Sequence, residues 1–159
     1  MANDMTPDSR TIPFDPVAFF EGKTRAYGLF EDRNGRVRRK MTVDMHGVRC
    51  GDVLTLKEDF VYDDGATETR TWTLTRLQGN TFRGTTHDAH GEPVGTRTPG
   101  EARIAYDFNL KLPKSGRTVV VHFDDRMMQM SETLVVNRAT VSKWGFRLGE
   151  VYLVMQKAA

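Results

Sequence analysis

The sequence has almost no cysteine. Cys50 is the single cysteine in 159 residues, so the chain cannot form an intramolecular disulfide, and the small disulfide-stapled folds are excluded. A lone thiol is typical of a reducing compartment. Residues 1–10 are polar and lack the apolar run of a secretory signal, which leads us to expect a cytoplasmic location.

Long apolar runs and an excess of one charge are also missing. The apolar stretch at residues 119–121 is far too short to cross a bilayer, which predicts no transmembrane segment. Basic and acidic residues number 23 and 21, so the chain lacks the basic field of a nucleic-acid-binding protein. The sequence contains no glycine-rich phosphate loop and no nucleophile elbow. Its four histidines lack zinc-site spacing, so we expect neither a metal nor a cofactor.

Alternation of apolar and polar residues is what the sequence does contain. Hydrophobic residues make up 38 % of the chain, enough for one ordinary domain with its own core. From Thr24 onward the apolar period is two, and glycine-containing turn dipeptides interrupt it, a pattern typical of an antiparallel meander. The turn dipeptides are Asn34-Gly35, Asp64-Gly65 and Gly79-Asn80. The predicted strands span residues 25–33, 36–46, 52–62, 67–77, 81–88, 101–112, 117–130, 132–142 and 146–156.

About nine consecutive strands cannot remain a flat sheet, because strand twist curls the sheet or splits it into two layers. A β-sandwich would need longer and less uniform connections than these turns. The sequence therefore predicts an all-β, up-and-down, lipocalin-like barrel over residues 14–159. Residues 1–13 are expected to form a flexible arm and residues 14–22 a lid on one barrel end. Residues 91–100 are expected to form a long connection or an irregular edge.

Alternate residues of a barrel strand face inward, so the apolar parity of each strand identifies its interior side chains. Glu58 and Tyr62 share a face with Leu56, and Arg70 shares a face with Trp72. We expect Glu58 and Arg70 to pair, because an unpaired buried charge is costly. The pair has two interpretations. It either fixes the strand register, or it forms the polar end of a ligand cavity in which Arg70 contacts a carboxylate or phosphate.

Further polar residues are candidates for the same interior. Asp88 has the parity of Phe82 on its strand, and two more candidates lie on later strands. Asp124 and Asp125 are adjacent, so at most one faces inward, which argues against a catalytic pair and favours a bulge or bend. The predicted ligand-binding residues are Glu58, Tyr62, Arg70, Trp72, Asp88, Tyr106 and Asn137.

From residue 19 to residue 157 the chain resembles an uncharacterised, mainly proteobacterial family of lipocalin-like (calycin) domains without an assigned activity. The matching motifs are Leu56-x-Glu58-x-Phe60-x-Tyr62-x-Asp64-Gly65, Arg70-x-Trp72, Gly84 with Asp88-x-x-Gly91, Tyr106, Asp124-Asp125-x-Met127, Asn137-Arg138, and Lys143-x-Gly145-Phe146-x-x-Gly149-Glu150. The resemblance implies a barrel and, by analogy with lipocalins and fatty-acid carriers, a hydrophobic ligand. The polar N-terminus departs from members with a lipoprotein signal, and Arg126 replaces an expected aromatic residue.

The sequence leaves three functions open. The first is a protein that binds a fatty acid, a lipid or another small hydrophobic or amphipathic molecule inside the barrel, and we rank it ahead of catalysis. The second is an isomerase or cyclase of lipid or small-hydrophobe metabolism, with Glu58 or Asp88 as general base. The third is a solid barrel that acts only through its surface. The sequence leaves the ligand's identity and the oligomeric state open.

Overall fold

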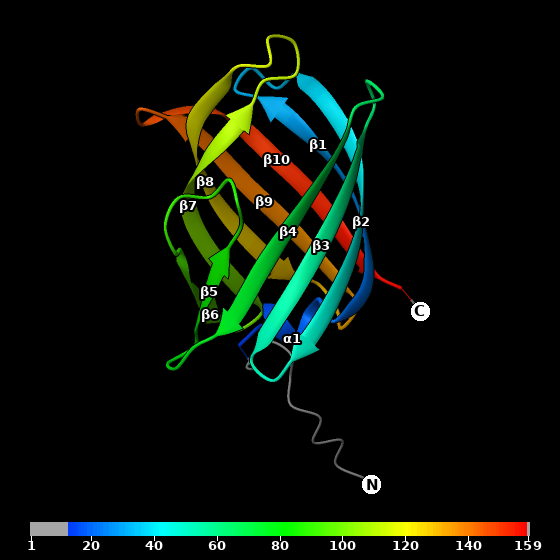
Figure 1. The fold of residues 1–159 in the computed structure, drawn as a ribbon, viewed down its shortest axis with the longest axis vertical. Helices are drawn as coiled ribbons and strands as arrows, with labels where there is room; N and C mark the ends of the chain where they lie inside the picture. Colours follow the sequence, from blue (N-terminus) through cyan, green and yellow to red (C-terminus); the bar gives the residue numbers. More distant parts are fainter. Residues whose placement is uncertain (1–12, 159) are drawn as a thin grey trace, which may run out of the picture.

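Ten antiparallel strands form one closed barrel in the computed structural model, which describes residues 13–158 (Figure 1). Apart from Pro13, the predicted N-terminal arm lies outside the described residues. One short helix, α1 (Pro16–Phe19), precedes the strands. The strands are β1 (Gly22–Asp32), β2 (Val37–Cys50), β3 (Val53–Tyr62), β4 (Thr67–Arg76), β5 (Thr81–Thr85), β6 (Val94–Thr98), β7 (Glu101–Lys111), β8 (Thr118–Gln129), β9 (Leu134–Lys143) and β10 (Phe146–Lys157).

Each strand pairs with its neighbours in the chain, and β1 closes the barrel by pairing with both β2 and β10. This is the all-β, up-and-down, lipocalin-like barrel that the sequence predicted. The tight turns explain the simple order. Gly35 and Gly65 adopt φ values of 79° and 85°, and each donates its N–H to a carbonyl oxygen three residues earlier at 3.0 Å. Glycine adopts this left-handed conformation without the steric cost of a Cβ atom.

The strand number differs from the prediction, because β6 lies within residues 91–100, the expected connection. β5 is also shorter than predicted: it ends at Thr85, and Ala89 donates its N–H to the Thr86 carbonyl in the turn that follows. Segment 86–93 then runs beside β7, where Ala89 forms a bridge with Phe108. An irregular segment thus completes the wall between β5 and β7.

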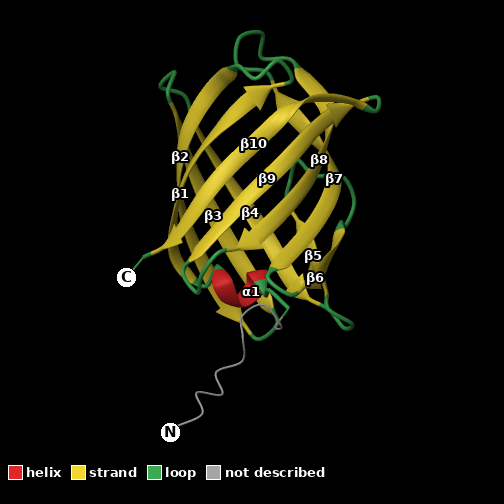
Figure 2. Ribbon diagram, turned by 180° about the vertical axis from the view of Figure 1, so that it is seen from behind, coloured by secondary structure: helices red, strands yellow, loops and turns green. Residues whose placement is uncertain are grey.

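Residues 14–20, with α1 at their centre, form the plug of the barrel. The segment lies across the lower barrel end in Figure 2, where the sequence predicted a lid. Phe14, Val17 and Phe20 are each at most 3 % exposed, so the plug is part of the core. The Asp15 carboxylate caps the helix by accepting the Val17 N–H at 3.0 Å.

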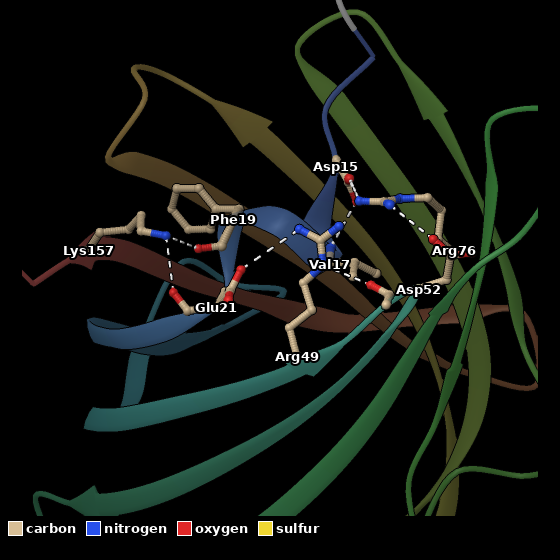
Figure 3. Close-up of polar contacts among 9 residues, drawn as sticks. Asp15, Val17, Phe19, Glu21, Arg49, Asp52, Arg76 and Lys157 are labelled. Carbon is tan, nitrogen blue, oxygen red and sulfur yellow. Dashed lines mark hydrogen bonds and ion pairs between the residues drawn. The ribbon is translucent and has the colours of Figure 1, made fainter.

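Polar contacts tie the plug to strands that are distant in the sequence (Figure 3). Arg76 of β4 pairs with Asp15 and, at 3.0 Å, with Asp52. Lys157, the last residue of β10, donates to the Phe19 carbonyl oxygen at 2.5 Å. The plug is therefore fixed from both sides of the barrel.

Candidate functional site

A cavity of about 690 Å³ occupies the barrel interior. It extends from Phe20 of the plug to Arg38 and Lys111 near the opposite barrel end, which we call the rim, and its walls are mainly apolar. A solid barrel, the third function left open by the sequence, is thereby excluded.

About halfway along the barrel, polar side chains from five strands interrupt the apolar wall. We call this group the inner polar cluster, and its members are Glu58, Arg70, Trp72, Tyr106, Asp125 and Asn137. The rings of Trp72 on β4 and Tyr106 on β7 lie edge to face with their centroids 5.3 Å apart. The two rings join the β4 and β7 parts of the cluster inside the barrel, where the short strands β5 and β6 lie between β4 and β7.

Glu58 is 8 % exposed and borders the cavity. Burial raises its pKa from 4.5 to about 7; the positive charge of Arg70 lowers it, and the negative charge of Asp125 raises it further. Among residues 13–158 Glu58 forms no ion pair, and the neighbouring Trp72 lowers its pKa by less than burial raises it. A carboxyl group with this pKa exchanges its proton near neutral pH.

The predicted pairing of Glu58 with Arg70 is wrong. The two residues face each other in the β3–β4 register, yet the Arg70 guanidinium pairs with Glu68, two residues away on the same strand. The guanidinium also lies 5.1 Å from the Phe60 ring centroid and 4.7 Å from that of Phe108. Because Glu68 already pairs with Arg70, the guanidinium of the inner polar cluster is not free for the ligand carboxylate or phosphate that the sequence led us to expect.

Asp125 is the second carboxyl group of the cavity. It accepts a hydrogen bond from the Tyr106 hydroxyl at 2.5 Å and one from Nδ2 of Asn137 at 3.4 Å. Burial raises its pKa from 3.8 to about 6 although both hydrogen bonds lower it, and burial beside Asp125 raises the pKa of Tyr106. Oδ1 of Asn137 is buried without a hydrogen-bond partner among the described residues. The cluster thus offers more acceptors than donors.

Tyr62 lines the cavity closer to the rim. Its hydroxyl donates to Glu68 at 3.4 Å, and the Arg39 guanidinium stacks 3.4 Å from its ring centroid. Burial raises the pKa of Tyr62 to about 12, so its hydroxyl keeps its proton. Tyr62 and Arg39 therefore form the polar wall on the rim side of the inner polar cluster.

A family model described as "protein of unknown function (DUF3833)" matches residues 3–157. The chain belongs to this family. No curated protein sequence matches this DUF3833 chain significantly.

Several solved structures of other proteins have a fold similar to that of the DUF3833 chain. The S-type phycobiliprotein lyase CPES of Guillardia theta superposes with a TM-score of 0.66 at 7 % identity, covering 90 % of each chain. Rv2717c of M. tuberculosis gives 0.62 at 12 % identity, covering 92 % of this chain and 99 % of the other. The barrel EF1p2_mFAP2b, solved bound to DFHBI, gives 0.51 at 12 % identity, covering 94 % and 98 %. At these identities the likeness establishes the barrel architecture.

Six of the seven residues predicted from the sequence line the cavity of the DUF3833 barrel: Glu58, Tyr62, Arg70, Trp72, Tyr106 and Asn137. Asp88 does not. It lies in the turn after β5, where its carbonyl oxygen accepts the Asn109 N–H at 2.8 Å. The prediction extended the parity of β5 beyond Thr85, where the strand ends.

Asp125 was not among the predicted ligand-binding residues, although the residue pattern of its strand indicates that it faces inward. The sequence pattern favoured a bulge or bend at Asp124-Asp125, whereas β8 runs through both residues in unbroken register with β7 and β9. Asp124 faces outward and pairs with Arg103 at 2.9 Å, while Asp125 shares the inward face with Phe123 and Met127. The parity of β8 alone identifies Asp125 as an interior residue.

The described residues were also compared with the requirements of a metal site and of a membrane-spanning helix. Among residues 13–158 no group of three or more His, Cys, Asp or Glu side chains is arranged to hold a metal ion. Within the same residues, no helix combines the length and apolarity needed to span a bilayer.

Proposed function

We propose that this barrel binds one small hydrophobic or amphipathic molecule, of the size of a fatty acid or a single-chain lipid, inside its cavity. The observation that carries the proposal is the 690 Å³ space with apolar walls and one polar cluster. Ligand pockets commonly measure about 300–1,000 Å³ and combine apolar walls with a few convergent polar groups. The plug closes one end, so a ligand enters through the rim. EF1p2_mFAP2b, which shares the fold and was solved bound to DFHBI, supports a ligand-binding role.

A bulky side chain placed in the cavity is expected to block binding. Ala139 is 3 % exposed and borders the cavity, whereas Ala105 is exposed on the outer face of β7. Ala139→Phe should weaken binding of the neutral fluorescent probe N-phenyl-1-naphthylamine at least tenfold, because the new ring occupies the probe's space. Ala105→Phe, the matched control, should leave the affinity unchanged. Fluorescence titration measures both, with thermal melting to verify that each variant is folded.

Equal probe affinity in the two variants would place the probe outside the barrel and overturn the proposal. Native mass spectrometry of the gently purified protein adds an independent test. A bound mass that Ala139→Phe loses and Ala105→Phe keeps supports an interior ligand. A wild-type protein that carries no mass and also fails to bind the probe counts against the proposed function.

A second candidate function, proton transfer to or from a bound molecule, rests on the state of Glu58. A buried carboxyl group with a pKa of about 7 and no ion-pair partner among residues 13–158 has the properties of a general base that works near neutral pH. Its position beside an apolar cavity favours such chemistry, because few competing waters fit between base and substrate.

A simple probe reaction tests this candidate. In 5-nitrobenzisoxazole a base removes the C3 proton while the ring N–O bond breaks to give a cyanophenolate, so no further reactant is needed. We expect the protein to accelerate this elimination, with the rate rising through an apparent pKa near 7, and Glu58→Gln to lower the rate at least a hundredfold. Absorbance of the phenolate measures the rate. A rate that Glu58→Gln leaves intact would exclude Glu58 as the base.

A further inference from the structure

The inner polar cluster and the adjoining Glu68 have an imbalance between charges of opposite sign. Three carboxyl groups, Glu58, Glu68 and Asp125, lie around one guanidinium, that of Arg70. Glu68 is the carboxylate that pairs with Arg70. Glu58 and Asp125 are left without an ion-pair partner among the described residues, although both are buried beside the cavity. A buried carboxylate without a cation is costly, so a ligand that supplies one is favoured.

The same cluster has an imbalance of hydrogen-bonding groups. The Tyr106 hydroxyl and Nδ2 of Asn137 are both directed to Asp125, so these donors are already used. On the acceptor side, the Glu58 carboxyl group borders the cavity, and the buried Oδ1 of Asn137, a residue that is 7 % exposed, has no partner within residues 13–158. The missing partner is a hydrogen-bond donor, and a protonated nitrogen supplies donors and positive charge together.

The distribution of charge along the cavity gives the ligand a direction. At the rim Arg38 pairs with Asp32 at 2.6 Å, and Arg39 pairs with Asp64 at 3.2 Å. Lys111, also at the rim, has no ion-pair partner among residues 13–158, so positive charge lies at the rim, whereas the unpaired carboxyl groups lie deeper. An amphipath with a cationic head therefore gains most when its head reaches the inner polar cluster and its chain contacts the apolar wall.

We propose that the cavity ligand carries a protonated nitrogen, such as an amine, amidine or related N–H-rich head, and that Glu58 and Asp125 bind this head inside the barrel. The inference rests on the proposed function, since it specifies the ligand class of the same cavity. It also revises the anionic ligand that the sequence suggested, because Arg70 is occupied by Glu68.

Three twelve-carbon probes that differ only in the head group test the inference. Dodecylamine, dodecanol and dodecanoate are titrated at pH 8 against N-phenyl-1-naphthylamine bound to the full-length protein. We expect dodecylamine to displace the fluorophore at concentrations at least tenfold lower than dodecanoate, with dodecanol between them. Glu58→Gln and Asp125→Asn should each reduce the preference for the amine to less than threefold. Glu132→Gln, which alters an exposed carboxylate in the β8–β9 turn, should keep the full preference.

The outcomes separate the inference from the function on which it rests. Dodecanoate binding as tightly as dodecylamine, or more tightly, overturns the cationic ligand and leaves a cavity that binds amphipaths. A preference for the amine that survives both carboxyl substitutions overturns the assignment to Glu58 and Asp125. Failure of all three probes and of the fluorophore to bind overturns the proposed function itself. Thermal melting of each variant identifies any that is not folded, and Glu58→Gln, a close isostere of the protonated carboxyl group, serves if Asp125→Asn is unstable.

Discussion

Replacing Glu58 by glutamine is expected to raise the free energy of unfolding by about 3 kcal/mol at pH 8.5 and to change it little at pH 5. Burial raises the pKa of Glu58 from 4.5 in the unfolded chain to about 7 in the barrel. Each pKa unit corresponds to about 1.4 kcal/mol, so the ionised barrel carries a penalty of about 3 kcal/mol. Glutamine has the shape of the protonated carboxyl group and no charge.

The sign of the pH dependence follows from proton binding. Between pH 4.5 and 7 the folded protein holds a proton on Glu58 that the unfolded chain has already released. The free energy of unfolding of the wild type therefore falls as the pH rises through this window and levels off above it. The difference between wild type and Glu58→Gln isolates this contribution from that of Asp125, which titrates in both proteins.

Urea denaturation of both proteins at pH 5 and pH 8.5 measures the effect. Glu132→Gln is the control, since Glu132 is exposed in a turn, and it should change the free energy of unfolding by less than about 0.5 kcal/mol at either pH. A Glu58→Gln effect of equal size at pH 5 and pH 8.5 would mean that Glu58 does not titrate in this window. The general-base candidate and the cation-binding inference would then lose their electrostatic support.

The features that could be predicted from the sequence are those that depend on residues close together in the chain. The positive φ values of Gly35 and Gly65 and the alternation along β3 depend on short segments, so the turns and the inward position of Glu58 were predictable. The pairing of Arg70 was not. Glu58 lies opposite Arg70 and Glu68 lies two residues before it, both on the inner face, and the choice between them depends on packing around the guanidinium.

The failure to predict strand β6 also has a physical reason that lies in packing between strands. Its inward residues are Gly95 and the half-buried Arg97, and a Cβ atom at Gly95 would lie 2.5 Å from the Phe82 ring of β5. The ring of one strand fills the space that a side chain of its neighbour would occupy, so β6 needs no apolar residue at this position. The sequence of β6 therefore shows no alternation of apolar and polar residues, because the apolar group that fills this space belongs to β5.

A substitution of Gly47 on β2 is expected to have the second large effect on stability. The residues next to Gly47 in the sequence do not indicate that a side chain is excluded there. A Cβ atom at this position would lie 1.8 Å from the backbone oxygen of Phe20 and 2.8 Å from its carbonyl carbon. The Phe20 backbone cannot yield easily, because its N–H donates to the Pro16 carbonyl at 3.1 Å and the adjacent Phe19 carbonyl accepts from Lys157. The plug and β2 are in contact only because residue 47 lacks a side chain.

Gly47→Ala is therefore expected to lower the free energy of unfolding by about 3 kcal/mol, the upper part of the range for overpacked interiors, by lifting the plug off β2. Gly84→Ala is the matched control: its Cβ atom would meet the side-chain ends of Ile104 at 3.1 Å and Leu74 at 3.3 Å, which can rotate away, so the cost should stay below about 1 kcal/mol. Denaturant unfolding measures both variants. Equal destabilisation would show that the plug is not seated on Gly47. A selective effect, joined by weaker binding of N-phenyl-1-naphthylamine, would establish the plug as the floor on which the cavity depends.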